Sequence, residues 1–186
     1  MSDDLVIAGK HFKSRLIVGT GRYRTMEDMV QALDASGTEL VTVAIRRLDL
    51  DNPNEKTILD YIDWDRYSIL PNTAGCQTVS EALFVAKLGR EVTKTDFVKL
   101  EVIPDAKYLF PDPAATLEAA EELVKEGFIV LPYIHADPVL SKRLEDVGCA
   151  TVMPLGSAIG SGQGIHTVEE IRIILEQANV PVVVDA

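Results

Sequence analysis

Short apolar runs alternate with amphipathic segments along most of this chain, and this alternation restricts its fold more than any other feature. The runs recur at a spacing of roughly 20 to 30 residues, which is the rhythm of βαβ units. We expect seven strands, at residues 15–19, 39–45, 68–71, 97–103, 128–134, 150–155 and 180–186. This order of elements predicts an α/β fold with a mainly parallel sheet.

The segments between these runs have the apolar spacing of helices. We expect helices at residues 26–35, 79–89, 114–126, 138–147 and 167–178. Asp112 before Pro113 and Asp137 before Pro138 are typical N-caps followed by proline at the first helical position. Glycines at 127 and 148 then follow the last periodic residues, as C-terminal caps do. Residues 49–67 are less regular, and we expect a loop and a short helix around 56–63.

Composition restricts the class of protein. The chain has 186 residues, of which 47% are hydrophobic, enough to bury one core, so we expect a single domain over residues 1–186. A net charge of -11 argues against a nucleic-acid partner and against an anionic membrane surface. The sequence starts without the basic flank and apolar run of a signal peptide, and no later run is long enough to span a membrane. We therefore expect a cytoplasmic protein.

Two opposite charges interrupt the expected strand at residues 97–103. Because side chains alternate across a strand, Lys99 and Glu101 share one face with Phe97 and Ile103, while the other face is apolar. Burying an unpaired ammonium group costs several kcal/mol or lowers its pKa. A lysine with a lowered pKa is what Schiff-base chemistry requires.

These charges help to choose between the two common α/β architectures. A doubly wound sheet is covered by apolar helices on both faces, whereas a strand of a (β/α)₈ barrel can aim functional side chains inward near its carboxyl end. We therefore expect a (β/α)₈ barrel with Lys99 and Glu101 at its mouth. The sequence stops in about the seventh strand, so we expect the C-terminal units of the barrel to be absent from it, which would leave sheet edges exposed.

Three charged residues are candidates for catalysis. Lys99 would attack a ketone to form an iminium group, although it could also be a structural ion pair with Glu101. Glu101 could move protons during this chemistry or act only as a counter-ion. Asp185 ends an apolar strand, where the active-site carboxylates of barrels are found, but it could equally cap a following helix.

Other segments give weaker signals for the same end of the barrel. The glycine-rich residues 156–164 could bind an oxyanion or phosphate through backbone N–H groups, or could be a plain flexible loop. They match neither the P-loop nor the dinucleotide-binding fingerprint. Residues 72–76 could line the mouth, with a packing role favoured for Cys76. Arg46 and Arg47 could bind an anionic substrate or be ordinary surface charges.

We expect neither a metal nor an organic cofactor. The three histidines, His11, His135 and His166, lack the spacing of metal ligands, and only His135 is placed to lie near the site. The two cysteines, Cys76 and Cys149, are far apart and fit neither a disulfide framework nor a zinc site.

Five segments in order resemble the bacterial thiazole synthases of thiamine biosynthesis. They are Gly19-Thr20-Gly21-Arg22-Tyr23, residues 41–47, residues 70–76, Lys99-Leu100-Glu101-Val102, and residues 153–164. The resemblance covers essentially the whole chain. It implies a (β/α)₈ barrel that builds thiazole phosphate carboxylate from 1-deoxy-D-xylulose 5-phosphate, dehydroglycine (iminoacetate) and the thiocarboxylate of a small sulfur carrier protein. Such an enzyme is a transferase of sulfur-containing groups.

The resemblance also implies roles for individual residues. Lys99 matches the Schiff-base lysine, and Glu101 and Asp185 match the acid/base carboxylates. Gly160 and Ala186 match backbone contacts to the sugar phosphate. Ala158 departs from the family pattern, which commonly has proline there. Implied partners are the sulfur carrier protein, an enzyme that generates dehydroglycine, and further copies of the chain in a homo-oligomer.

Two other functions stay open from the residues alone. A class I aldolase-like lyase acting on a sugar phosphate would also use a barrel lysine, a phosphate loop and a nearby carboxylate. A non-catalytic barrel subunit that binds a partner is the second alternative. Buried charges at positions 99, 101 and 185 argue against it, because such a subunit does not need them.

Overall fold

A curved parallel sheet forms the centre of the computed structural model, which describes residues 3–48 and 56–186. Its strands are hydrogen-bonded in sequence order, each parallel to the next. They are β3 (Ile17–Gly19), β4 (Leu40–Ala44), β5 (Ser68–Asn72), β6 (Phe97–Leu100), β7 (Ile129–Ile134) and β8 (Met153–Pro154). Sequential parallel order with a helical crossover between most strands is the topology of a (β/α)₈ barrel, which confirms the expected fold class.

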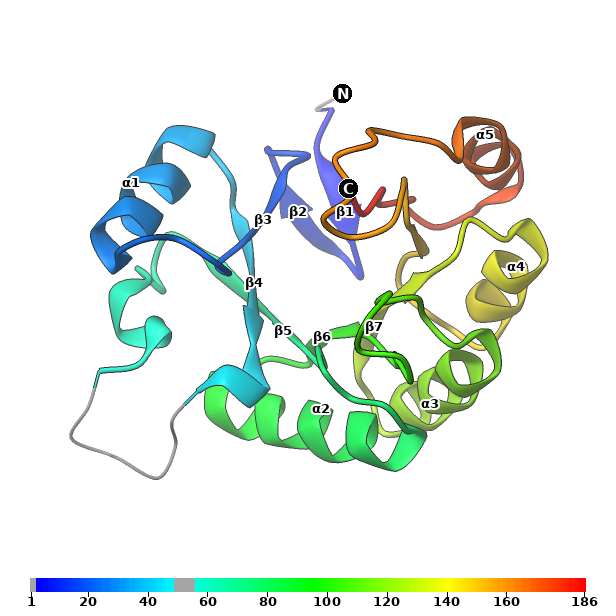
Figure 1. Ribbon diagram of the computed structural model, residues 1–186, viewed down its shortest axis with the longest axis horizontal. Helices are drawn as coiled ribbons and strands as arrows, with labels where there is room; N and C mark the ends of the chain where they lie inside the picture. Colours follow the sequence, from blue (N-terminus) through cyan, green and yellow to red (C-terminus); the bar gives the residue numbers. More distant parts are fainter. Residues whose placement is uncertain (1–2, 49–55) are drawn as a thin grey trace.

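Five α-helices cover the outer surface of this sheet (Figure 1). They are α1 (Met26–Ser36), α2 (Val79–Thr93), α3 (Pro113–Lys125), α4 (Pro138–Asp146) and α5 (Val168–Gln177). The side chains of Asp112 and Asp137 accept hydrogen bonds from the first turns of α3 and α4, as the sequence predicted. Two short 3-10 helices, η1 (Ile45–Arg47) and η2 (Ile58–Tyr61), follow β4. The loop that we expected from residue 49 falls in part on residues 49–55, which lie outside the described residues.

The two faces of the strands bury different side chains. Val98, Leu100 and Val102 point outward and pack with the helices in the largest apolar cluster. Phe97 points inward, where it packs with Leu40, Leu70, Leu131 and Met153 from the neighbouring strands. This separation is the one that alternation along residues 97–103 predicted.

A short antiparallel hairpin closes the amino end of the barrel interior. Its strands are β1 (Leu5–Ile7) and β2 (Lys10–Phe12), and they lie inside the curve of the sheet in Figure 1. Ile7 and Phe12 are buried in the cluster that contains Phe97 and Leu131. The hairpin therefore covers one end of the interior and leaves the carboxyl ends of the strands as the mouth.

Three of the elements that differ from their predicted bounds do so for a physical reason that the structure shows. β6 ends at Leu100, because beyond it the backbone bonds to a loop: Ile103 N donates to Cys76 O over 2.8 Å. α2 continues past Gly89 to Thr93, since Gly89 is a close-packing position, where a Cβ would lie 3.1 Å from Pro71.

The last predicted strand, at residues 180–186, is two isolated parallel bridges, Val152 to Val182 and Leu155 to Asp185. Pro154 and Pro181 lack N–H groups, so the ladder between the two segments cannot be continuous. Among the described helices, none is long and apolar enough to cross a membrane.

Candidate active site

Lys99, Glu101 and Asp185 meet at the carboxyl end of the barrel interior. Lys99 comes from β6, Glu101 directly follows this strand, and Asp185 is bridged to Leu155 beyond β8. The Lys99 ammonium Nζ lies 3.5 Å from Glu101 Oε1 and also contacts the Asp185 carboxylate. Their side chains are only 14%, 9% and 19% exposed, in that order. The structure thus brings the three predicted catalytic residues into one buried ionic cluster.

The protonation of this cluster differs from the expectation of a lowered lysine pKa. Burial lowers the pKa of Lys99, but the charges of Glu101 and Asp185 outweigh it, so that the pKa is raised. Burial also raises the pKa of Glu101, although Lys99 opposes this rise. Lys99 is therefore an ammonium group in the unliganded protein. The expectation of a lowered pKa was wrong because it holds for an unpaired lysine, whereas Lys99 is paired with Glu101, as the alternative interpretation had it, and also with Asp185.

Tyr133 forms the floor beneath the lysine. The Lys99 ammonium lies 5.6 Å from the centroid of the Tyr133 ring, a cation–π contact. Tyr133 is 1% exposed, and its hydroxyl lies 3.4 Å from the carbonyl oxygen of Leu109. Burial and the nearby carboxylates raise the pKa of this phenol, so it stays protonated.

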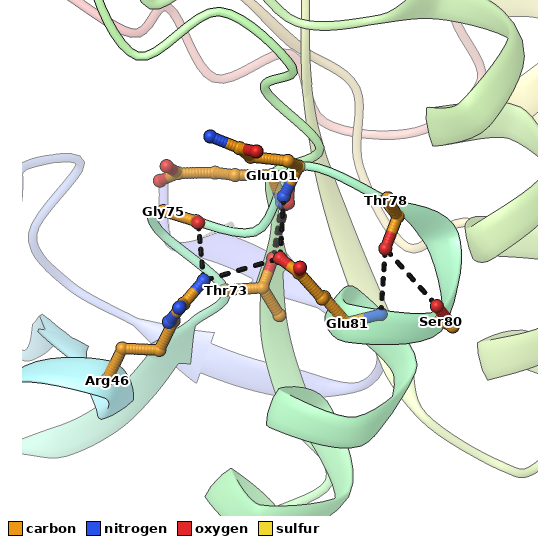
Figure 2. Close-up of polar contacts among 8 residues, drawn as sticks. Arg46, Thr73, Gly75, Thr78, Ser80, Glu81 and Glu101 are labelled. Carbon is orange, nitrogen blue, oxygen red and sulfur yellow. Dashed lines mark hydrogen bonds and ion pairs between the residues drawn. The ribbon is translucent and has the colours of Figure 1, made fainter.

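Thr73, in the loop after β5, holds the backbone of Glu101 (Figure 2). Its hydroxyl donates to Glu101 O and accepts from Glu101 N, both over 2.7 Å. Thr73 N also donates to Lys99 O over 3.2 Å. These bonds continue from the pairing of β5 with β6 and hold the backbone of Glu101 where β6 ends.

A cavity of about 500 Å³ lies beside the ionic cluster. Lys99 lines it together with residues at the carboxyl ends of β3, β4 and β5, among them Gly19, Thr20, Thr42 and Asn72. Asn72 Nδ2 donates to Thr42 Oγ1 over 2.8 Å, so the wall carries ordered polar groups. The volume is typical of a site for a small molecule.

The two adjacent arginines that the sequence singled out have different positions. Arg46 points to the loop after β5, where it donates to Gly75 O and lies 3.4 Å from Glu81 (Figure 2). Glu81 Oε2 also accepts from Gln77 N over 2.9 Å at the start of α2. Arg47 instead lines the cavity. Only the second arginine is therefore placed to contact a ligand there.

The glycine-rich loop after β8 is anchored next to Asp185. Gly156 N donates to Asp185 O over 2.7 Å, and Ser157 donates to Gly164 O. Gly160 has a φ of +75°, a conformation that favours glycine. Gly160 and Ala186 are both exposed, and neither is among the described residues that line the cavity. The structure thus places the two predicted phosphate contacts apart from the cavity.

The remaining candidates have no catalytic arrangement. His135 is exposed and stacks with Phe110, with ring centroids 4.9 Å apart. Cys76 is buried in the outer apolar cluster, where burial raises the pKa of its thiol, in agreement with a packing role. Within residues 3–48 and 56–186, no group of three or more His, Cys, Asp or Glu side chains could hold a metal ion.

Sequence reasoning missed Tyr133, and it included Thr73 in the segment 72–76 at the mouth without giving it a role. Tyr133 lies in an apolar strand without a polar neighbour to mark it; in the structure it pairs with Met153 and shares the inner face with Leu131, two positions before it. Thr73 gives no signal in the sequence, because its bond partners lie 28 positions away.

Comparisons with known proteins identify the family of this chain. Residues 6–186 match the family model described as thiazole biosynthesis protein ThiG. A thiazole synthase from Synechococcus sp. is 60% identical over all of this chain and 69% of its own length. The bifunctional protein ThiO/ThiG of Trichormus variabilis is 61% identical, and the chain spans 29% of its length.

Two solved structures resemble the chain to different degrees. The chain superposes on the Amycolatopsis orientalis BexX/CysO complex with a TM-score of 0.83 and 32% identity, covering 97% of this chain and 73% of that one. A dihydrodipicolinate synthase, with a TM-score of 0.57 and 12% identity over 89% of this chain and 62% of that one, shares the fold alone. On the family match and the relatives' identities, the chain belongs to the ThiG family of thiazole biosynthesis proteins.

Proposed function

We propose that the protein is a thiazole synthase, a transferase of sulfur-containing groups that acts in thiamine biosynthesis. It would form the thiazole phosphate carboxylate from 1-deoxy-D-xylulose 5-phosphate, dehydroglycine and a carrier-protein thiocarboxylate. The observation that carries this proposal is the buried contact of Lys99 with Glu101 and Asp185 at the mouth of a ThiG-family barrel. Names of the relatives, such as the thiazole synthase of Synechococcus sp., support it.

The first step is imine formation at the sugar ketone. The neutral Lys99 amine attacks the carbonyl carbon, the carbinolamine loses water, and a protonated imine remains. Its positive charge acidifies the adjacent carbon, which then gives up a proton to form an enamine. Lys99 starts as an ammonium group, so it must first transfer a proton to a neighbouring base.

Glu101 and Asp185 are the bases within reach of that proton, because both contact the Lys99 ammonium. The raised pKa of Glu101 makes it a stronger base than an ordinary carboxylate, which suits the removal of protons from nitrogen and carbon. The same groups can protonate the departing hydroxyl of the carbinolamine.

We assign the sugar phosphate to backbone groups at Gly160 and Ala186. Three observations support this: the glycine-rich loop, its anchoring to Asp185, and the resemblance of its sequence to the family. The partner in the BexX/CysO complex and the ThiO/ThiG fusion support a sulfur carrier and a dehydroglycine-generating enzyme as partners. We also propose one barrel domain, a homo-oligomer and a cytoplasmic location.

Borohydride trapping tests this function. The protein is incubated with 1-deoxy-D-xylulose 5-phosphate, reduced, digested and analysed by mass spectrometry, and we expect one adduct on Lys99. Lys99→Met should form none, while Lys87→Met, which removes an exposed lysine of α2, should behave as the wild type. A folded wild-type protein without an adduct would contradict the imine mechanism.

A second measurement distinguishes the thiazole synthase from an aldolase-like lyase. Thiazole formation should require the thiocarboxylated carrier, whereas a lyase would cleave the sugar phosphate without it. Cleavage at the same rate with and without carrier would overturn the proposal while leaving the adduct intact.

A further inference from the structure

We propose that Arg47 binds the carboxylate of the glycine-derived substrate, on the opposite side of Lys99 from the sugar-phosphate loop. This inference rests on the proposed function, since it names the place of its second small substrate. It makes Arg47 a residue for substrate binding and orientation within the cavity beside the ionic cluster.

The charge of the cavity is the first observation. The described residues that line it include four cations and no Asp or Glu side chain. The cations are Arg22, Arg47, Lys56 and Lys99. In a chain with a net charge of -11, this concentration of positive charge favours an anionic ligand.

The position of Arg47 is the second observation. A Cβ atom on Gly21 would lie 3.2 Å from Arg47 Nη1, so the glycine leaves room for the guanidinium against the loop after β3. Burial raises the pKa of Glu101, and the positive charge of Arg47 is among the effects that lower it. The guanidinium is therefore close enough to the ionic cluster to act on it electrostatically.

Topology separates this cavity from the proposed phosphate contacts. The sheet order is β3-β4-β5-β6-β7-β8, and the cavity is lined from β3 to β6, ending at Lys99. Gly160 follows β8 and Ala186 follows Asp185, beyond the other side of β6. A sugar phosphate bound by these groups with its ketone at Lys99 leaves the arginine side of the cavity for another anion.

A small carboxylate suits this side. A guanidinium group forms two parallel hydrogen bonds with a carboxylate, which fixes the orientation of the ligand as well as binding it. Thr42 and Asn72 add hydroxyl and amide groups to the wall between Arg47 and Lys99. Dehydroglycine carries such a carboxylate next to its reactive carbon, which this placement would direct toward the sugar on Lys99.

Saturation kinetics test the proposal. Thiazole formation is measured with glyoxylate and ammonia, which form dehydroglycine in solution, and with oxamate as a stable analogue that competes with it. In Arg47→Gln, we expect the half-saturating glyoxylate concentration and the oxamate inhibition constant to rise about 10- to 100-fold, as for loss of a charge-assisted hydrogen bond. Arg47→Lys keeps the charge but loses the paired N–H donors of the guanidinium, so its half-saturating concentration and inhibition constant should be intermediate.

Borohydride trapping with 1-deoxy-D-xylulose 5-phosphate alone separates this inference from the proposed function. Arg47→Gln should form the Lys99 adduct at the same sugar concentration as the wild type, which also shows that it is folded. Arg24→Gln removes an exposed arginine that is not among the described cavity residues and is the matched control.

Two results would overturn the inference. One is unchanged saturation by glyoxylate and oxamate in Arg47→Gln. The other is that this variant needs a higher sugar concentration than the wild type for adduct formation, which would make Arg47 a phosphate ligand. A wild-type protein that forms no adduct would instead refute the proposed function.

Discussion

The two ends of the barrel interior are built on the same strands but have opposite chemistry. At the amino end, Phe97 and Leu131 pack with the β1–β2 hairpin in an apolar layer. Two residues further along the same strands, Lys99 contacts the carboxylates of the ionic cluster and lies over the Tyr133 ring. Because the side-chain period of a strand is two, one strand can supply a stabilising residue and a reactive residue on the same face.

This difference separates stability from function. Each large apolar side chain buried at the amino end contributes roughly 1.5–3 kcal/mol to folding. The charged layer contributes little, since removing ions from water costs about as much as their attraction returns. The amino end therefore provides the stability that allows the carboxyl end to hold buried charges, and changes at the two ends should have different effects.

The largest effect should come from Glu101→Gln, which leaves the shape of the charged layer intact but removes a base. We expect exchange of the hydrogens next to the sugar ketone with solvent deuterium, followed by NMR, to slow about 100-fold or more, as for loss of a general base. The stability of the variant should change little by comparison.

The pH dependence of this exchange provides a separate test. Burial raises the pKa of Glu101 above that of an ordinary glutamate, so the carboxyl is still protonated at a pH where an ordinary glutamate is ionised. Exchange in the wild type should therefore fall with decreasing pH, with a midpoint above the pKa of an ordinary glutamate. Glu101→Gln should not show this fall of the exchange rate at low pH. A pH dependence equal to that of the wild type would make Glu101 a counter-ion only.

At the amino end, Leu131→Ala should have the reverse effect. Leu131 is fully buried, and its truncation should lower the free energy of unfolding by about 2–5 kcal/mol. Urea denaturation measures this loss, and Leu16→Ala, the same change at a half-exposed leucine, is the control. The folded fraction of Leu131→Ala should still form the Lys99 adduct, and its absence would mean that the two ends are not independent.

Thr73→Val should produce a smaller effect on both properties, because Thr73 connects the loop to the charged layer. Two hydrogen bonds to the Glu101 backbone are lost, so we expect about 1–3 kcal/mol of destabilisation and slower deuterium exchange. Thr73→Ser keeps the hydroxyl and should restore both. A loss in Thr73→Ser without a loss in Thr73→Val would show that the methyl group, not the hydroxyl, is what matters.

Most of the fold could be predicted from the sequence because its signals are local. The apolar runs, the Asp-Pro caps at 112 and 137, and the alternation over residues 97–103 each depend on neighbouring residues. The same alternation was sufficient to place Lys99 and Glu101 inside the barrel.

The parts that could not be predicted depend on contacts between distant segments. The end of β6 at Leu100 is decided by a loop that precedes it by more than twenty residues, and the continuation of α2 through Gly89 by packing against Pro71 and Ile45. Burial lowers the pKa of Lys99, and among the charges that raise it, Glu101 is close in sequence but Asp185 is 86 positions away (185 minus 99). Local patterns therefore pointed to the residues of the ionic cluster, but not to their protonation.

The smallest effect should come from Arg46→Gln, which lies at the carboxyl end but outside the barrel interior. Arg46 is about half exposed, and its contact with Glu81 should contribute at most about 1 kcal/mol to stability. We expect adduct formation and saturation by glyoxylate to match the wild type, in contrast to Arg47→Gln. If the two variants lost glyoxylate affinity equally, the chemistry of this end would depend on its general positive field, and not on side chains that face the cavity.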